Sequence, residues 1–142
     1  MSQRRKTDLR SYYTRVAKRA GHRCEYCHAP ESFFPHRLSL DHFVPESAGG
    51  PTALANLVLC CYGRQFQKLA FESGLDPTTK TIRPLFHPRR QRWNRHFRWS
   101  EDRLHLEGLT RIGRATIERL ALNNQRQIEA RSRWKLHPDL FP

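Results

Sequence analysis

The order of apolar and polar positions along the chain predicts a helix followed by strands. Residues 9–20 have the amphipathic pattern of a helix, with Asp8 placed to cap its start and Gly21 to end it. Residues 37–44 alternate apolar and polar side chains, which predicts a half-buried strand. The short apolar run at residues 57–59 fits either a second strand or the entry to a helix.

A helical spacing returns directly after these strands. Cys61, Gln65 and Lys68 recur at i, i+4 and i+7, so they share one face of a predicted helix that extends to about Glu72. The breaker sequence at residues 74–77 is expected to end this helix.

The C-terminal part of the chain is predicted to be mainly helical. A strand is expected over residues 102–106, and Thr110 is placed to cap a helix after it. One face of that helix follows the i, i+4, i+7, i+8 rule through Gly113, Ile117, Leu120 and Ala121. The pair at residues 123–124 interrupts it, and residues 125–134 form a last predicted helix. With 142 residues, the chain is expected to form a single α+β domain, 1–142.

The charge of the chain points to a polyanionic partner. Lys and Arg number 26 against 13 Asp and Glu, for a formal charge of +13. Clustered cations gain affinity for nucleic acid by releasing the counterions that its phosphates hold, although a membrane surface or no specific partner would also fit. The N-terminal arm and first helix contribute candidate phosphate contacts, which would equally fit a solvated helix face, namely Arg4, Arg5, Lys6, Arg10, Arg15, Lys18 and Arg19.

Residues 80–99 form a second basic segment, which contains no acidic residue and has four large aromatic side chains. Phe86, Trp93, Phe97 and Trp99 could serve as stacking platforms for bases or as core residues. No run of 18 apolar residues predicts a membrane span, and the N-terminus lacks a secretory signal, so a cytoplasmic protein is expected.

Four cysteines occur as Cys24-x-x-Cys27 and the adjacent pair Cys60-Cys61. In a reducing compartment this arrangement favours a metal site or simple burial over disulfides.

The candidate chemistry lies between the two cysteine clusters. Asp41 and His42 place a hard metal ligand beside a proton acceptor, and Pro45, Gly49-Gly50 and Asn56 follow them. This combination is typical of metal-assisted hydrolysis.

The ordered set of Cys-x-x-Cys, Asp-His, Gly-Gly, Asn-Leu and Cys resembles the HNH endonuclease family, also called the ββα-metal or His-Me finger group. Residues 22 to about 70 are similar to its nuclease module. The continuation through residues 85–116 is similar to the C-terminal extension of a compact bacterial subgroup.

The resemblance implies a ββα-metal core at residues 22–73, between a basic N-terminal helix at 1–21 and an extension with helices at 74–135. It implies an endonuclease that hydrolyses double-stranded DNA with Mg²⁺ or Mn²⁺. His42 would be the general base, Asp41 and Gln65 would hold the cation, and Asn56 would fix the loop that carries the histidine.

The resemblance also implies a structural zinc ion bound by Cys24, Cys27 and Cys61, with Cys60, His28 or His22 completing the set. The basic side chains expected to contact nucleic acid are Lys68, Arg64, Arg89 and Arg90. All four attract phosphate by charge, and the arginines can also donate two parallel hydrogen bonds.

Three positions differ from the usual family pattern: Ser39 and Gln65 at the cation site, and Arg64 where a fourth cysteine is common. They leave open a catalytically weak or inactive relative that binds nucleic acid. A third alternative is a basic structural protein whose thiols hold zinc.

Overall fold

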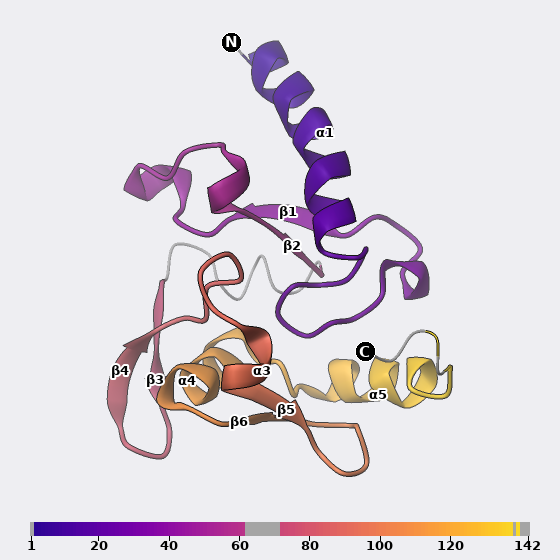
Figure 1. Cartoon of the computed structure of the whole chain (residues 1–142), viewed down its shortest axis with the longest axis vertical. Coiled ribbons are helices and arrows are strands. Elements are labelled where there is room, and N and C mark those ends of the chain that lie inside the picture. The colour runs from indigo at the N-terminus through magenta and orange to yellow at the C-terminus, as the bar shows by residue number, and fades with distance from the viewer. Residues whose placement is uncertain (1, 62–71, 138, 140–142) are drawn as a thin grey trace.

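The computed structural model describes residues 2–61, 72–137 and 139. Its N-terminal half contains helix α1 (Ser2–Arg19) and the antiparallel strands β1 (Ser39–His42) and β2 (Leu57–Cys60). Three short 3-10 helices lie around these strands, at Glu31–Phe33, Glu46–Ala48 and Leu54–Asn56. Figure 1 shows the C-terminal end of α1 beside this strand pair, with the N-terminus at the far tip of the helix.

The C-terminal half contains two more antiparallel strand pairs and three helices within the described residues. The strands are β3 (Ser73–Asp76) with β4 (Thr81–Pro84), and β5 (Phe97–Trp99) with β6 (Leu106–Gly108). The helices are α3 (Trp93–His96), α4 (Arg111–Leu120) and α5 (Gln125–Trp134). Helix α4 packs against β3, β4 and β6 (Figure 1). The described chain is therefore a mixed α+β structure.

Helix α1 is longer than its apolar pattern predicts. It begins at Ser2, so the expected cap Asp8 lies inside the helix, which makes that prediction wrong. Its last turn buries Val16 and Ala17 against the β1–β2 pair. Gly21 follows the helix with a φ of 64°, as expected for the residue that ends it.

The predicted strand at residues 37–44 is confirmed as β1, and the run at 57–59 is a strand rather than a helix entry. The register pairs Ser39 with Cys60 and His42 with Leu57. All four residues of β2 are buried. The predicted helix over residues 61–72 falls almost entirely on residues 62–71, which lie outside the described part of the chain.

The structure differs from the sequence expectation at two places beyond residue 72. Residues 74–76, expected to be a breaker, belong to β3, which pairs with β4 as an antiparallel hairpin. Residues 102–105 form a turn, because the Asp102 carboxylate accepts from Ser100 Oγ at 2.6 Å and from the Leu104 amide at 3.0 Å. Strand β6 begins only at Leu106.

The two C-terminal helices are confirmed, and so is the Thr110 cap; Asn124, predicted only to interrupt the helical pattern, caps the second helix. Thr110 Oγ1 accepts from the Gly113 amide at 3.0 Å, and Asn124 Oδ1 accepts from the Gln127 amide at 2.9 Å. Gly113 is required by packing, since an added Cβ would lie 2.2 Å from the His96 carbonyl oxygen.

One hydrophobic cluster joins both halves of the chain. Leu57 and Leu59 of β2 belong to the same buried cluster as Phe86, Phe97 and Leu120. The partly buried side chains of Trp93 and Trp99 pack against this cluster, with their ring centroids 5.9 Å apart. These two tryptophans therefore act as core residues. No helix among the described residues is long and apolar enough to cross a membrane.

Candidate active site and cysteine cluster

His42 is the last residue of β1, and its ring contacts the loop that follows. The Nε2 atom lies 2.9 Å from Thr52 Oγ1 and 3.4 Å from Glu46 Oε1. The side chain is 18% exposed, so the imidazole is held by two polar neighbours and still reaches solvent. A histidine in this setting is suited to proton transfer with a bound substrate or water.

Asn56 holds the loop between β1 and β2 in place. Its Oδ1 accepts from the Val44 amide at 2.8 Å, and its Nδ2 donates to the carbonyls of Val44 at 3.0 Å and Pro51 at 2.8 Å. The side chain is buried. Only glycine fits at position 50 beside it, because an added Cβ would lie 1.7 Å from the Val44 carbonyl oxygen. The loop next to His42 is thus fixed by one amide.

We expect Asn56→Ala to lower the free energy of unfolding by about 2–4 kcal/mol, because three backbone groups would lose their partner. Urea unfolding followed by circular dichroism measures this change. The exposed Asn94 provides the control, since Asn94→Ala should change stability by about 0.5 kcal/mol or less. Equal stability of the two variants would show that the loop does not depend on Asn56.

Asp41 precedes His42 on β1 and lies opposite Val58. Asp41 interacts electrostatically with the buried Tyr26. Burial is the main cause that raises the pKa of Tyr26 above its usual value, and the negative charges of Cys60 and Asp41 raise this pKa further. Asp41 and His42 thus face different neighbours, as expected for adjacent residues of a regular strand. Within the described residues, Asp41 joins no group of three His, Cys, Asp or Glu spaced for a metal ion.

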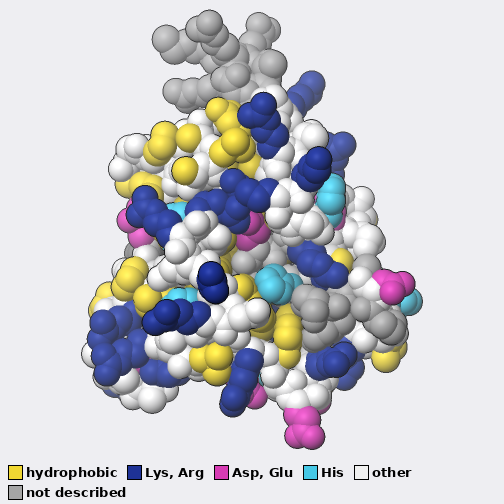
Figure 2. Space-filling model, in the orientation of Figure 1, with side chains coloured by type: hydrophobic (Ala, Val, Ile, Leu, Met, Phe, Trp, Pro, Cys, Tyr) yellow, Lys and Arg dark blue, Asp and Glu magenta, His cyan; other side chains and the backbone are white. Residues whose placement is uncertain are grey.

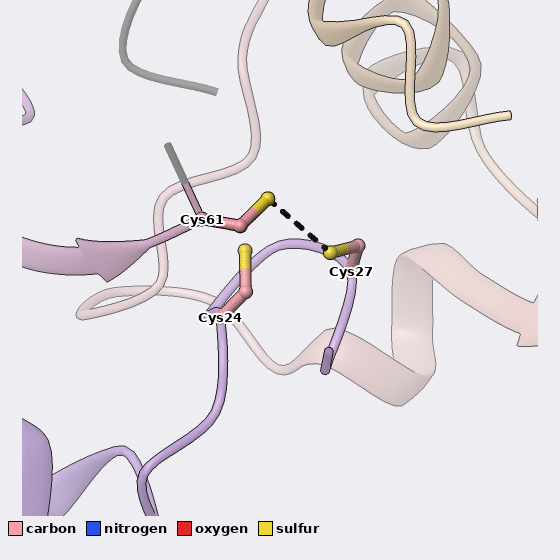
Figure 3. A group of neighbouring side chains, drawn as sticks. All are labelled: Cys24, Cys27 and Cys61. Carbon is pink, nitrogen blue, oxygen red and sulfur yellow. Dashed lines mark hydrogen bonds between the residues drawn. The ribbon is translucent and has the colours of Figure 1, made fainter. Parts of the chain in front are cut away.

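Three cysteines form such a group. The Sγ atoms of Cys24, Cys27 and Cys61 all lie within 4.8 Å of one another, and those of Cys27 and Cys61 are 3.9 Å apart (Figure 3). Tetrahedral zinc with Zn–S bonds of about 2.3 Å separates two sulfurs by about 3.8 Å. The cluster could therefore bind a metal ion such as zinc.

The thiols are buried and not joined by disulfides. Burial, with the nearby thiols of Cys27 and Cys61, raises the pKa of Cys24 well above its usual value. The raised pKa favours the protonated thiol. A bound cation would favour the thiolate instead, because metal ligation requires thiolates. Cys60, His28 and His22, expected as further ligands, do not join the group.

A comparison with protein-family models matches residues 24–62 to the family described as HNH endonuclease. This segment is therefore similar to HNH endonucleases. Comparisons with curated proteins and with solved structures gave no match. The HNH domain begins at Cys24 and contains β1, the Asn56 loop, β2 and Cys61, so it joins the candidate site and the cysteine cluster. Members of this family are commonly endonucleases that use metal ions, and the domain implies a function related to nucleic acid.

Glu25 links the first turn of the HNH domain to β2 and to the C-terminal part of the chain. Its amide donates to the Leu59 carbonyl at 2.9 Å, and its carboxylate accepts from the Leu59 amide at 2.8 Å. The same carboxylate forms an ion pair with Arg89, whose side chain is only 17% exposed. Arg89, expected to contact nucleic acid, is instead committed to a buried pair that supports the HNH fold.

The neighbouring arginines are differently placed. Arg90, Arg92 and Arg95 are exposed, line one pocket of about 460 Å³, and form no ion pair within the described chain. Of these three arginines only Arg90 was predicted to contact nucleic acid, although all three lie in the acid-free segment. Figure 2 shows Lys and Arg side chains spread over the visible face of the molecule, with far fewer acidic side chains.

Four more of the predicted site residues lie in residues 62–71 or in helix α1. Gln65, Lys68 and Arg64 lie in residues 62–71, outside the described chain. Arg19 of α1 is used within the fold, since its guanidinium donates to the Leu54 carbonyl at 2.9 Å and the Leu57 carbonyl at 2.7 Å.

Proposed function

We propose that the HNH domain hydrolyses phosphodiester bonds of DNA with a divalent cation, Mg²⁺ or Mn²⁺, and with His42 as the general base. The observation that carries this proposal is the position of His42. Its side chain is partly exposed at the end of β1, in the segment that matches the endonuclease family. Thr52 and Glu46 orient the ring, and the three hydrogen bonds of Asn56 fix the loop that bears them.

In this proposal His42 removes a proton from the water that attacks the phosphorus. Asp41 supplies a hard oxygen ligand for the cation, and Gln65 is proposed as a second one. The chemistry that a cation held there would supply is neutralisation of charge on the phosphate and the leaving oxygen. Asn56 acts on the loop rather than on the substrate.

Double-stranded DNA is the proposed substrate, and exposed arginines are its proposed backbone contacts. Arg90, Arg92 and Arg95 present guanidinium groups around one pocket, and such groups bind phosphate oxygens through two parallel hydrogen bonds. Lys68 and Arg64 remain proposed contacts. Arg89 is left out because of its ion pair with Glu25.

We expect the double variant Arg92→Gln, Arg95→Gln to weaken duplex binding and to reduce the slope of log K against log salt by about one to two, since up to two phosphate contacts are lost. Fluorescence anisotropy over a salt series measures this slope. The matched control is Arg126→Gln, Arg133→Gln, which removes the same charge from exposed positions of α5. An equal loss in both variants would mean that net charge alone controls binding.

We further propose that Cys24, Cys27 and Cys61 bind structural zinc. Their spacing carries this part of the proposal. The bound ion would tie the turn after α1 to the end of β2, on either side of the strand pair that bears His42.

The alternative function is nucleic-acid binding with weak or no cleavage. It is favoured by the surroundings of Asp41, which has no metal-spaced group of His, Cys, Asp or Glu around it among the described residues. Ser39, which lies two positions earlier on β1, offers a hydroxyl where a stronger ligand would support the cation.

The two functions are separated by incubating the full-length protein with supercoiled plasmid in Mg²⁺, in Mn²⁺ and in EDTA. Nicking that depends on the cation supports hydrolysis. Gel retardation without nicking supports the binding function. Absence of both at low salt contradicts both and leaves a basic structural protein.

A further inference from the structure

We propose that the side-chain carboxamide of Gln127 is the fourth ligand of the zinc ion held by Cys24, Cys27 and Cys61. This inference rests on the zinc site proposed above, and it adds a ligand from outside the HNH domain. Gln127 lies 66 positions after Cys61 in the chain, in helix α5.

The distance between Gln127 and Cys61 is the first argument. The terminal amide nitrogen of Gln127 lies 3.6 Å from Cys61 Sγ. The oxygen and nitrogen of a carboxamide exchange places by a half-turn of the group, and their assignment rests on the hydrogen-bond partners assumed. In tetrahedral zinc, with Zn–S of about 2.3 Å and Zn–O of about 2.0 Å, sulfur and oxygen are about 3.5 Å apart. A turned Gln127 amide thus brings its oxygen to the separation of two ligands on one ion.

No fourth His, Cys, Asp or Glu joins the three thiols among the described residues. A structural zinc ion takes four ligands, and the thiols supply three. The ring of His28 stacks on Trp93 at 4.1 Å, and His22 Nδ1 lies 3.2 Å from Glu31. Neither these histidines nor Cys60 joins the thiol group, whereas the amide of Gln127 contacts one of its members.

The fold holds the backbone of Gln127 near Cys61. Its backbone amide donates to Asn124 Oδ1 at 2.9 Å, which fixes the first turn of α5. At the other end of the helix, Trp134 is buried, and Arg131 Nη1 donates to the Leu104 carbonyl at 2.8 Å. The half-buried side chain therefore starts from an anchored backbone, and little further ordering is needed to bind the ion.

The zinc ion would then join two distant parts of the protein. Cys24 and Cys27 come from the turn after α1, Cys61 from the end of β2, and Gln127 from the last helix. Zinc binding would stabilise the contact of α5 with the HNH domain as well as the domain itself.

The test compares Gln127→Leu and Gln127→Glu in the full-length protein. Leucine removes the oxygen, and glutamate keeps one in place. We expect Gln127→Leu to weaken zinc binding by about 10- to 100-fold in chelator competition. It should also change the visible absorption of the Co²⁺-substituted protein. Gln127→Glu should bind zinc at least as tightly as the wild type. Gln125→Leu, at an exposed position of the same helix, should match the wild type in both measurements.

The glutamate variant also separates a ligand from a hydrogen-bond donor. If Gln127 only donates an N–H to the Cys61 thiolate, Gln127→Glu loses affinity as Gln127→Leu does, and the proposal is overturned. Unchanged zinc affinity and Co²⁺ spectrum in Gln127→Leu also overturn it, with the zinc site intact. A wild-type protein that binds no zinc removes the site and this inference together, while the nuclease proposal stands on its own assay.

Discussion

Replacing His42 by alanine should lower the rate of plasmid nicking by about 10²- to 10⁴-fold, the range that a general base contributes. The substitution removes the partly exposed imidazole, whose Nε2 contacts Thr52 and Glu46. DNA affinity should stay near the wild-type value, because the proposed phosphate contacts are Arg and Lys side chains and do not include His42. Initial rates of conversion from supercoiled to open-circular plasmid measure the first effect, and anisotropy measures the second.

His105→Ala is a suitable control for this experiment. His105 is exposed in the turn before β6, so its loss should leave the nicking rate unchanged. Should His42→Ala nick plasmid as fast as the wild type, His42 is not the base. Nicking that survives EDTA in both proteins would point to an activity that does not use the proposed site.

The second large effect is expected for Cys61→Ser, which should abolish stoichiometric zinc binding and sharply lower the melting temperature. Two remaining thiols are too few for a structural zinc site, and zinc binding can contribute about 10 kcal/mol to the folding of small domains. Elemental analysis of the purified protein and thermal melting followed by circular dichroism measure the two changes.

The adjacent Cys60 provides a matched control, because it is equally buried but lies outside the metal-spaced group. Cys60→Ser places the same hydroxyl in the core and should keep one zinc ion per chain. If both variants lose the same stability and neither affects zinc content, the thiols of the cluster are only core residues. A wild-type protein that folds without zinc would lead to the same conclusion.

Features that depend on neighbouring residues could be predicted from the sequence. Thr110 and Asn124 cap helices within a few residues of themselves, so the bounds of α4 and α5 follow from local pattern. Strand β1 was predicted by its alternation, and the HNH family by the spacing of residues 24–61.

Features that depend on distant partners could not be predicted. Strand β3 is an exception, because its partner is near in the sequence: its glycine and aspartate favour turns, but hairpin pairing with residues 81–84 makes these residues a strand. Arg89 was predicted to contact phosphate because its charge is visible in the sequence. Its pairing with Glu25, which is far away along the chain, appears only in three dimensions.

The candidate site shows the same division. Asp41, His42 and Asn56 were found from residue type and order, whereas the contacts of His42 with Thr52 and Glu46 depend on how the loop folds back. The approach of Gln127 to Cys61 spans half of the chain and follows no motif.

The central claim is that His42 acts on a phosphodiester beside a cation held by Asp41. Anomalous scattering from Mn²⁺ in crystals of His42→Ala protein with a short DNA duplex tests it most directly. Our account predicts an Mn²⁺ peak bonded to an Asp41 oxygen and to a phosphate oxygen of the DNA, with the space of the missing imidazole facing that phosphate. A bound duplex with no Mn²⁺ at Asp41, or with its nearest phosphate on the opposite side of β1 from residue 42, would contradict it.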